Sequence, residues 1–184
     1  KSFFIFPKIM NKKLFGTDGI RGHYGSEEIN DRMAYRLGVA IGKHLRNHNI
    51  INGSVLLGRD PRISGQRLQK ACSAGITKEG FQPLDAGTLP TPALAYGTTF
   101  LKAKMGVMVT ASHNPASDNG LKLFSAKGAK LSMDEEKEVE GLLLANEYTD
   151  ENYAEGERIE VCENYIQNIC DFFHANFLEG KHII

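Results

Sequence analysis

The sequence predicts an α/β protein in which a mixed β-sheet is sandwiched between helices. Residues 54–58 and 105–109 are short apolar runs of strand length, and each is followed by a polar loop that contains proline. The segments around them space their apolar residues as helices do. Over residues 54–84, a strand, a helix and a second strand follow one another, which is typical of a βαβ unit and of parallel pairing.

Further along the chain, the same reasoning assigns the remaining elements. The apolar run from Met105 continues as a central strand up to Ser112, and a second strand follows the intervening loop so closely that the two resemble a hairpin. We expect helices over residues 31–46, 65–79, 93–101, 132–145 and 159–173, and strands over residues 54–58, 81–84, 105–112 and 120–124.

Two helix starts carry capping signals. Ser64 is expected to cap the second helix, with Ile63 and Leu68 placed to pack against each other as a hydrophobic staple. Ser132 and Glu135 have the spacing of a capping box, in which each side chain satisfies the other residue's backbone N–H. The many charges that follow Ser132 are expected to form a solvated face of that helix.

Composition excludes several classes of protein. The chain has 184 residues, enough for one domain and the start of a second, with 41% hydrophobic and 24% charged residues. Its formal net charge is zero, so we expect no nucleic-acid partner and no membrane-surface partner. No apolar run approaches the roughly 20 residues of a membrane-spanning helix.

The N-terminus and the cysteines bear on cellular location. Residues 1–11 are interpreted as a leader or extension, because their apolar stretch is too short for a signal peptide and Pro7 interrupts it. Cys72, Cys162 and Cys170 are odd in number and lack metal-ligand spacing, so we expect buried or half-buried reduced thiols. Reduced thiols are typical of proteins in the cytoplasm, so we expect a cytoplasmic location.

The central strand ends in a loop that displays polar side chains. Residues 110–115, Thr-Ala-Ser-His-Asn-Pro, would lie at the carboxyl end of a buried strand, where open α/β sheets bind their ligands. Pro115 ends the regular structure there. The alternative is an ordinary turn in which Ser112 and Asn114 bind only the local backbone.

A second candidate loop is rich in glycine. Residues 15–22 contain three glycines, which allow backbone N–H groups to approach a ligand closely. Arg21 at its end can bind a phosphate or a carboxylate through two parallel hydrogen bonds. The loop matches neither the dinucleotide-binding nor the P-loop pattern, and a glycine-rich surface turn is the alternative.

Four motifs in order resemble the α-D-phosphohexomutase family. They are Phe-Gly-Thr-Asp-Gly-Ile-Arg-Gly at 15–22, Gly-Arg-Asp-x-Arg-x-Ser-Gly at 58–65, Pro-Thr-Pro-Ala at 90–93 and Thr-Ala-Ser-His-Asn-Pro at 110–115. The first motif most resembles the bacterial branch that acts on glucosamine phosphates. The resemblance implies a first domain at 12–156 that carries a phosphoserine loop, and the truncated beginning of a second similar domain at 157–184.

The resemblance also implies a reaction and its residues. Glucosamine 6-phosphate and glucosamine 1-phosphate would interconvert through a phosphoserine and a sugar bisphosphate, supplying UDP-N-acetylglucosamine and peptidoglycan synthesis. Arg59, Asp60 and Arg62 would be mainly architectural, beneath the site. The implied catalytic residues are Ser112, His113, Lys122 and Arg21. The implied phosphate- or substrate-binding residues are Thr17, Asp18, Gly19 and Asn114.

Family members need Mg²⁺, which would bind the phosphate on Ser112, with glucosamine or glucose 1,6-bisphosphate as activator. The family's aspartate-rich metal loop, its sugar-recognition loop and its C-terminal phosphate loop are absent from residues 1–184. We therefore expect this chain alone to lack mutase activity. The oligomeric state does not follow from the sequence.

Three alternatives stay open. A phosphomannomutase or phosphoglucomutase of the same family differs only in the sugar, which is selected outside this chain. A serine hydrolase would need a Gly-x-Ser-x-Gly turn and a histidine distant in sequence, whereas His113 directly follows Ser112. A non-catalytic binding fragment is the third.

Overall fold

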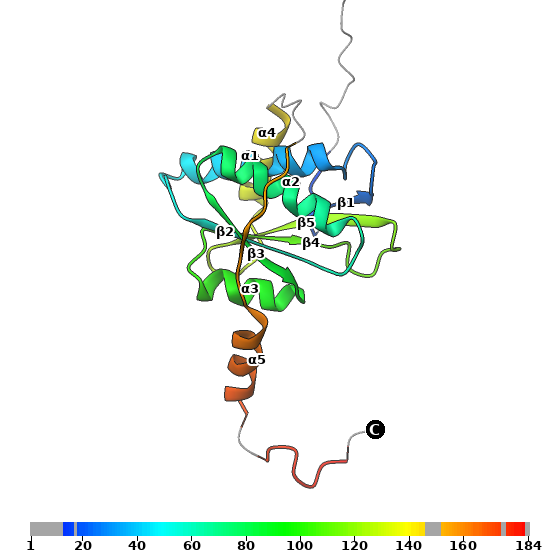
Figure 1. Ribbon diagram of the computed structural model, residues 1–184, viewed down its shortest axis with the longest axis vertical. Coiled ribbons are helices and arrows are strands. Elements are labelled where there is room, and N and C mark those ends of the chain that lie inside the picture. The colour runs from blue at the N-terminus through cyan, green and yellow to red at the C-terminus, as the bar shows by residue number, and fades with distance from the viewer. Residues whose placement is uncertain (1–12, 17, 146–151, 174–175, 183–184) are drawn as a thin grey trace, which may run out of the picture.

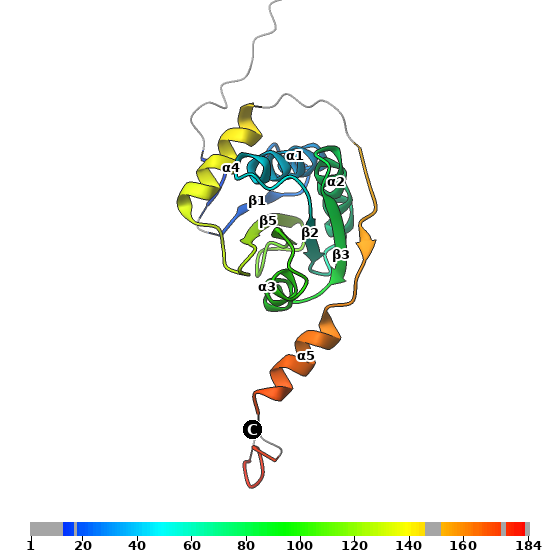
Figure 2. The same ribbon diagram turned by 90° about the vertical axis from the view of Figure 1, so that its left-hand side faces the viewer.

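A six-stranded mixed sheet forms the centre of the protein, with helices on both faces (Figures 1 and 2). The computed structural model describes residues 13–16, 18–145, 152–173 and 176–182. The predicted leader, residues 1–11, lies outside them, as do residues 146–151. The strands are β1 (Ile20–His23), β2 (Ser54–Arg59), β3 (Gln82–Thr88), β4 (Met105–Val109), β5 (Asp118–Ser125) and β6 (Glu157–Arg158). The helices are α1 (Asp31–Asn47), α2 (Gly65–Lys78), α3 (Thr91–Phe100), α4 (Met133–Ala145) and α5 (Cys162–Asp171).

The strand order is β1-β5-β4-β2-β3-β6. Strands β4, β2, β3 and β6 pair in parallel, whereas β5 is antiparallel to both β4 and β1. The carboxyl ends of β2 and β4 therefore lie at the same edge of the sheet as the start of β5. The predicted fold class, a mixed sheet between helices, is confirmed.

Each face of the sheet has its own apolar core. Helices α1, α2 and α4 cover one face, and α3 covers the other (Figure 2). Helices α1 and α2 pack closely because glycines lie where they meet: a Cβ on Gly38 would be 2.1 Å from the Cys72 carbonyl oxygen, and one on Gly75 would be 2.1 Å from that of Tyr35. Any larger residue at either position would push the helices apart.

The two predicted helix caps differ in outcome. Ser132 and Glu135 form the predicted capping box, with the Ser132 N–H 2.8 Å from Glu135 Oε2 and the Glu135 N–H 3.3 Å from Ser132 Oγ. The prediction for the start of α2 was wrong. Ser64 makes no capping bond with its side chain, and Ile63 is fully exposed, so no staple forms. The Ser64 hydroxyl instead accepts a hydrogen bond from Asn119, across the sheet edge.

The C-terminal segment also departs from expectation. The predicted helix over 159–173 covers only Cys162–Asp171, and residues before it form β6, which pairs with β3. Val161 is buried in the core beneath α3, whereas α5 has no buried residue and projects from the body of the protein (Figure 1). The early part of this segment thus belongs to the same sheet as the rest.

Cys72 is buried, Cys162 is partly exposed and Cys170 is exposed, and all three are free thiols. The expectation of burial is therefore wrong for Cys170. Among the described helices, none combines the length and the apolar character needed to cross a bilayer.

Candidate functional site

Ser112 lies in a strained turn just beyond the end of β4. The strand ends at Val109, three residues before Ser112, so the predicted strand was too long. Ser112 has a φ of 57°, in the left-handed region that residues with a Cβ seldom adopt. Its N–H donates to Thr110 Oγ1 at 2.9 Å, and its side chain is exposed. Such strain persists only where the surroundings hold the backbone, and it is frequent at functional sites.

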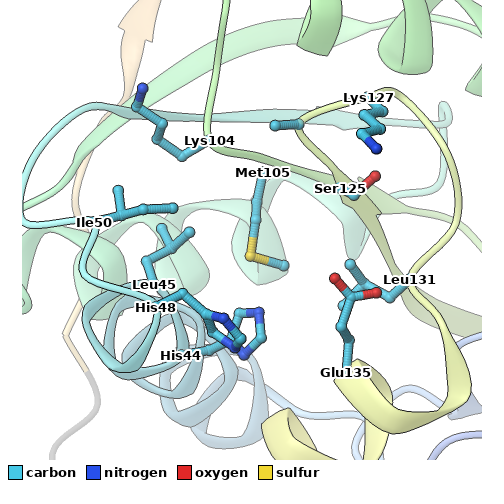
Figure 3. A pocket seen from close by; sticks show the side chains of 11 residues that line it. His44, Leu45, His48, Ile50, Lys104, Met105, Ser125, Lys127, Leu131 and Glu135 are labelled. Atoms are coloured by element: carbon cyan, nitrogen blue, oxygen red, sulfur yellow. The ribbon is translucent and has the colours of Figure 1, made fainter.

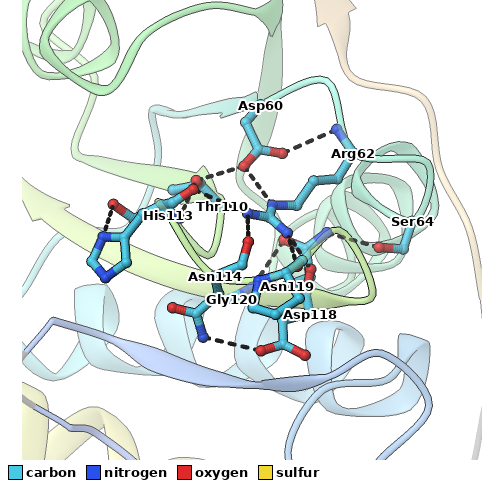
Figure 4. A network of polar contacts seen from close by, with 11 residues as sticks. Asp60, Arg62, Ser64, Thr110, His113, Asn114, Asp118, Asn119 and Gly120 are labelled. Carbon is cyan, nitrogen blue, oxygen red and sulfur yellow. Dashed lines mark hydrogen bonds and ion pairs between the residues drawn. The ribbon is translucent and has the colours of Figure 1, made fainter.

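The guanidinium of Arg62 bonds several carbonyl groups of this loop (Figure 4). It donates to the carbonyl oxygens of Ser112 at 3.0 Å, Asn114 at 2.8 Å and Asp118 at 3.0 Å, and also to that of Pro115. These four carbonyls come from one loop, and a single side chain fixes them relative to one another. The Arg62 side chain is only 10% exposed, although its bonds to the Ser112 and Pro115 carbonyls lie at the surface.

Asp60 connects Arg62 to the end of β4. Its Oδ2 accepts from Arg62 Nε at 2.9 Å and from the Thr110 hydroxyl at 2.7 Å, while Thr110 Oγ1 in turn accepts from the Ser112 N–H. The chain of contacts therefore runs from the carboxyl end of β2 to the strained serine. A fully hydrogen-bonded network of this kind restricts the loop to one conformation.

A second group of charges gathers beside the glycine-rich loop. Asp18 Oδ2 lies 2.6 Å from the Lys122 ammonium and also pairs with Arg21. Burial raises the pKa of Asp18, but the hydrogen bond and charge of Lys122, together with Arg21, hold that pKa below its usual value. Asp18 is therefore ionised at neutral pH and positions both cations.

Gly19 brings Asp18 against β5. Its φ is 86°, and a Cβ there would lie 2.4 Å from the Leu121 carbonyl oxygen, so only glycine fits. β1 then begins at Ile20, opposite Leu121. Thr17, the other predicted phosphate-binding residue of this loop, lies outside the described residues.

The structure thus places the predicted residues in two groups. Ser112 and His113 lie together, with Ser112 Oγ 3.5 Å from His113 Nδ1, and Lys122, Arg21 and Asp18 form the other group. Within the described part of the chain, neither cation bonds to Ser112. Both groups are at or near one edge of the sheet, because Thr110 on the serine side bonds Gly120, which pairs with Arg21.

Asn114, predicted to bind substrate, donates from its side-chain amide to Asp118 Oδ2 at 3.0 Å. In this structure it serves the loop itself. Sequence reasoning missed Thr110 and Asn119, although both lie within or next to motifs that it quoted. Asn119 is fully buried, and its side chain bonds both the Ser64 hydroxyl and the Gly120 N–H.

The residues around Ser112 do not by themselves suit Mg²⁺. This ion prefers about six oxygen ligands in octahedral geometry. The Asp60 and Asp118 carboxylates nearby are already bound to Arg62, Thr110 and Asn114. In the described part of the loop, a phosphate on Ser112 would be the main ligand available.

Comparison with known proteins agrees with this geometry. Residues 12–150 match the family model described as phosphoglucomutase/phosphomannomutase, alpha/beta/alpha domain I. The phosphoglucosamine mutase of Actinobacillus succinogenes is 48% identical over 132 residues, which are 72% of this chain and 29% of that protein. The phosphoglucosamine mutase of Campylobacter fetus is 38% identical over 180 residues, 94% of this chain and 40% of that protein.

Among solved structures, a putative phosphomannomutase from Thermus thermophilus superposes with a TM-score of 0.82 at 30% identity, covering 92% of this chain and 38% of that one. The chain thus spans well under half the length of these relatives. Its match to the first-domain model covers most of its length, and its strained serine and glycine-rich loops lie inside that match. The chain belongs to the phosphoglucomutase/phosphomannomutase family, whose first domain it contains.

Proposed function

We propose that this chain is the phosphoserine-bearing part of a mutase that interconverts glucosamine 6-phosphate and glucosamine 1-phosphate. The proposal rests mainly on the position of Ser112, which is exposed at the tip of a turn that Arg62 and Thr110 hold in a left-handed conformation. An exposed hydroxyl on a rigid turn can be phosphorylated and can present its phosphate to a sugar. The named relatives support the amino sugar as substrate.

The reaction transfers one phosphoryl group in each direction. The bond from Ser112 Oγ to phosphorus breaks as a bond from the free sugar hydroxyl oxygen to phosphorus forms, which yields the bisphosphate and a free serine. The hydroxyl proton passes to a base, and Ser112 Oγ takes up a proton. The bisphosphate then reorients, and its other phosphoryl group returns to Ser112. The protein contributes positioning and charge stabilisation.

Lys122 and His113 are the groups proposed to move the proton, and Arg21 is proposed to offset phosphate charge. Lys122 is 12% exposed and Arg21 is 24% exposed, so their charges act in a partly desolvated setting. Asp18 holds both cations in place before substrate binds. Thr17, Gly19 and Asn114 complete the proposed phosphate-binding set.

Other partners follow from the same proposal. Mg²⁺ would bind the phosphate on Ser112 with ligands supplied from outside these residues. The activator would be glucosamine or glucose 1,6-bisphosphate. The protein would act in the cytoplasm on a phosphosugar, without a nucleic-acid or membrane partner.

A second candidate is a mutase for mannose or glucose phosphates, favoured by the likeness to the Thermus structure. The two candidates share the Ser112 chemistry and differ in the sugar alone. An experiment can separate the two candidates. The whole protein is incubated with glucosamine, glucose or mannose bisphosphate, and the rates at which each bisphosphate phosphorylates Ser112 are compared.

The proposal is tested by mass analysis of the peptide that contains Ser112. In the whole protein exposed to a hexose bisphosphate, this peptide should gain one phosphoryl group, and Ser112→Ala should abolish both the modification and mutase activity. Ser117→Ala is the matched control, because Ser117 is another exposed serine of the same loop. A serine that no bisphosphate charges would refute the proposal and favour a non-catalytic binding role.

A further inference from the structure

Two histidines and a glutamate lie close together near the amino end of β4, whereas the Ser112 loop follows its carboxyl end. His44 is in the last turn of α1, His48 directly follows that helix, and Glu138 comes from α4. The neighbouring pocket is lined by Met105 at the start of β4, whereas Ser112 follows the end of β4. The two sites are thus separated by the length of the strand.

One carboxylate oxygen lies between the two rings. Glu138 Oε2 is 3.1 Å from His44 Nδ1 and 2.9 Å from His48 Nε2, and the rings are tilted with centroids 4.6 Å apart. The ligand atoms of all three residues lie within 4.8 Å of one another. A tetrahedral zinc ion bound at about 2.0–2.1 Å separates its ligand atoms by about 3.3 Å, so small side-chain movements would admit one.

The His44 ring has an unmet need for a partner. Its side chain is 7% exposed, and Nδ1 has no hydrogen bond of suitable geometry although Glu138 is near. Buried polar atoms nearly always have partners, so an exception calls for an explanation.

The surroundings suit an ion with an open position. Figure 3 shows the two rings side by side at one wall of the pocket, with Lys104 and Lys127 at the opposite side. Asn47 donates to the other oxygen of Glu138 at 3.1 Å, which orients the carboxylate from outside. Three protein ligands and a free side toward the pocket leave room for one water.

The geometry points to a binding site for a zinc-type divalent metal ion at His44, His48 and Glu138. Two imidazoles and one carboxylate are ligands that zinc, rather than magnesium, prefers. Because the ligands come from α1 and α4, the ion would join these helices and stabilise the face of the sheet that they cover. The site is independent of the proposed mutase chemistry.

The test is zinc binding to the metal-free whole protein. Binding is measured by competition with a chromophoric chelator, and excess Mg²⁺ is present to occupy sites that offer only oxygen ligands. Ser112→Ala should be the background, so that no phosphoserine contributes. We expect one zinc ion per chain and a rise in melting temperature. Because loss of an outer partner already costs 10–100-fold in affinity, His48→Gln and Glu138→Gln should each weaken binding about 100-fold or more.

His23→Gln and Cys170→Ser are the matched controls, since each removes an exposed potential ligand elsewhere. Both should bind zinc as the background protein does. Cobalt substitution should give visible absorption without a thiolate charge-transfer band. Absence of binding, binding that survives both His48→Gln and Glu138→Gln, or binding lost in either control would overturn the inference.

Discussion

Replacing Arg62 with alanine removes a side chain that joins Asp60 to four carbonyls of the Ser112 loop. Two of these carbonyls, those of Ser112 and Pro115, are on exposed residues and can regain water. Asp60 is only 18% exposed and would lose its cationic partner, keeping the Thr110 hydroxyl. The cost therefore arises mainly from an uncompensated carboxylate.

Removing one partner of a buried ion pair costs about 3–5 kcal/mol. Because both side chains keep some contact with water, we expect the lower end, about 3 kcal/mol, for Arg62→Ala. Lys137→Ala is the control: its ion pair with Asp134 is exposed, and the loss should be below about 0.5 kcal/mol. Urea unfolding followed by circular dichroism measures the two losses of stability, with the same dependence of the unfolding free energy on urea concentration used for each variant.

Arg62→Lys sharpens the test. A lysine ammonium keeps the charge but cannot reproduce the planar fork that reaches several acceptors at once. We expect Arg62→Lys to recover part of the stability while the rate at which a hexose bisphosphate charges Ser112 remains low. An Arg62→Ala protein as stable as Lys137→Ala, or one that charges Ser112 at the wild-type rate, would refute this reasoning.

Four further outcomes are expected. Gly25→Ala should cost about 1–2 kcal/mol from its left-handed conformation alone, because a Cβ there meets nothing within 4 Å, whereas Gly19→Ala should cost more because it also clashes with β5; equal losses by urea unfolding would contradict this. The two cationic partners of Asp18 lower its pKa, so the stability that distinguishes wild type from Asp18→Asn should be present at neutral pH and disappear as the pH falls below the usual value of 3.8; a difference independent of pH would argue against the cluster. Ser132→Ala should lower the free energy of unfolding by about 1 kcal/mol, because α4 loses its cap, whereas Ser132→Asp should keep most of that stability. Residues 1–184 alone should show no mutase turnover in a coupled assay, and measurable turnover would contradict the need for ligands outside them.

The sequence predicted the sheet and its helices because burial leaves a periodic trace. The spacing of apolar residues located α1, α2 and β4 to within a few residues, since these elements face the core. Strand β6 was missed because two charged residues carry no such trace, and their pairing with β3 depends on a segment distant in sequence.

The candidate site was predicted where chemistry is concentrated in a motif. Ser112 and Arg21 were singled out from the residue pattern and Lys122 through the resemblance, and their catalytic roles stay predictions. The hydrogen bonds of Arg62 confirm that it supports the loop. The prediction that Ser64 caps α2 was wrong. Helix-start statistics favour a local cap, whereas the Ser64 hydroxyl accepts a hydrogen bond from Asn119, 55 positions away. The pairing of His44 with Glu138 was invisible because their helices are far apart along the chain.

The two outermost strands of the sheet are both short and polar. At one end β6 has two residues, Glu157 and Arg158, and at the other β1 has four, including Arg21 and His23. By pairing with β3, β6 covers part of an edge that would otherwise expose a seven-residue strand. Short charged margins offer a poor template for strands of another molecule, so self-association through backbone pairing is disfavoured even at high concentration.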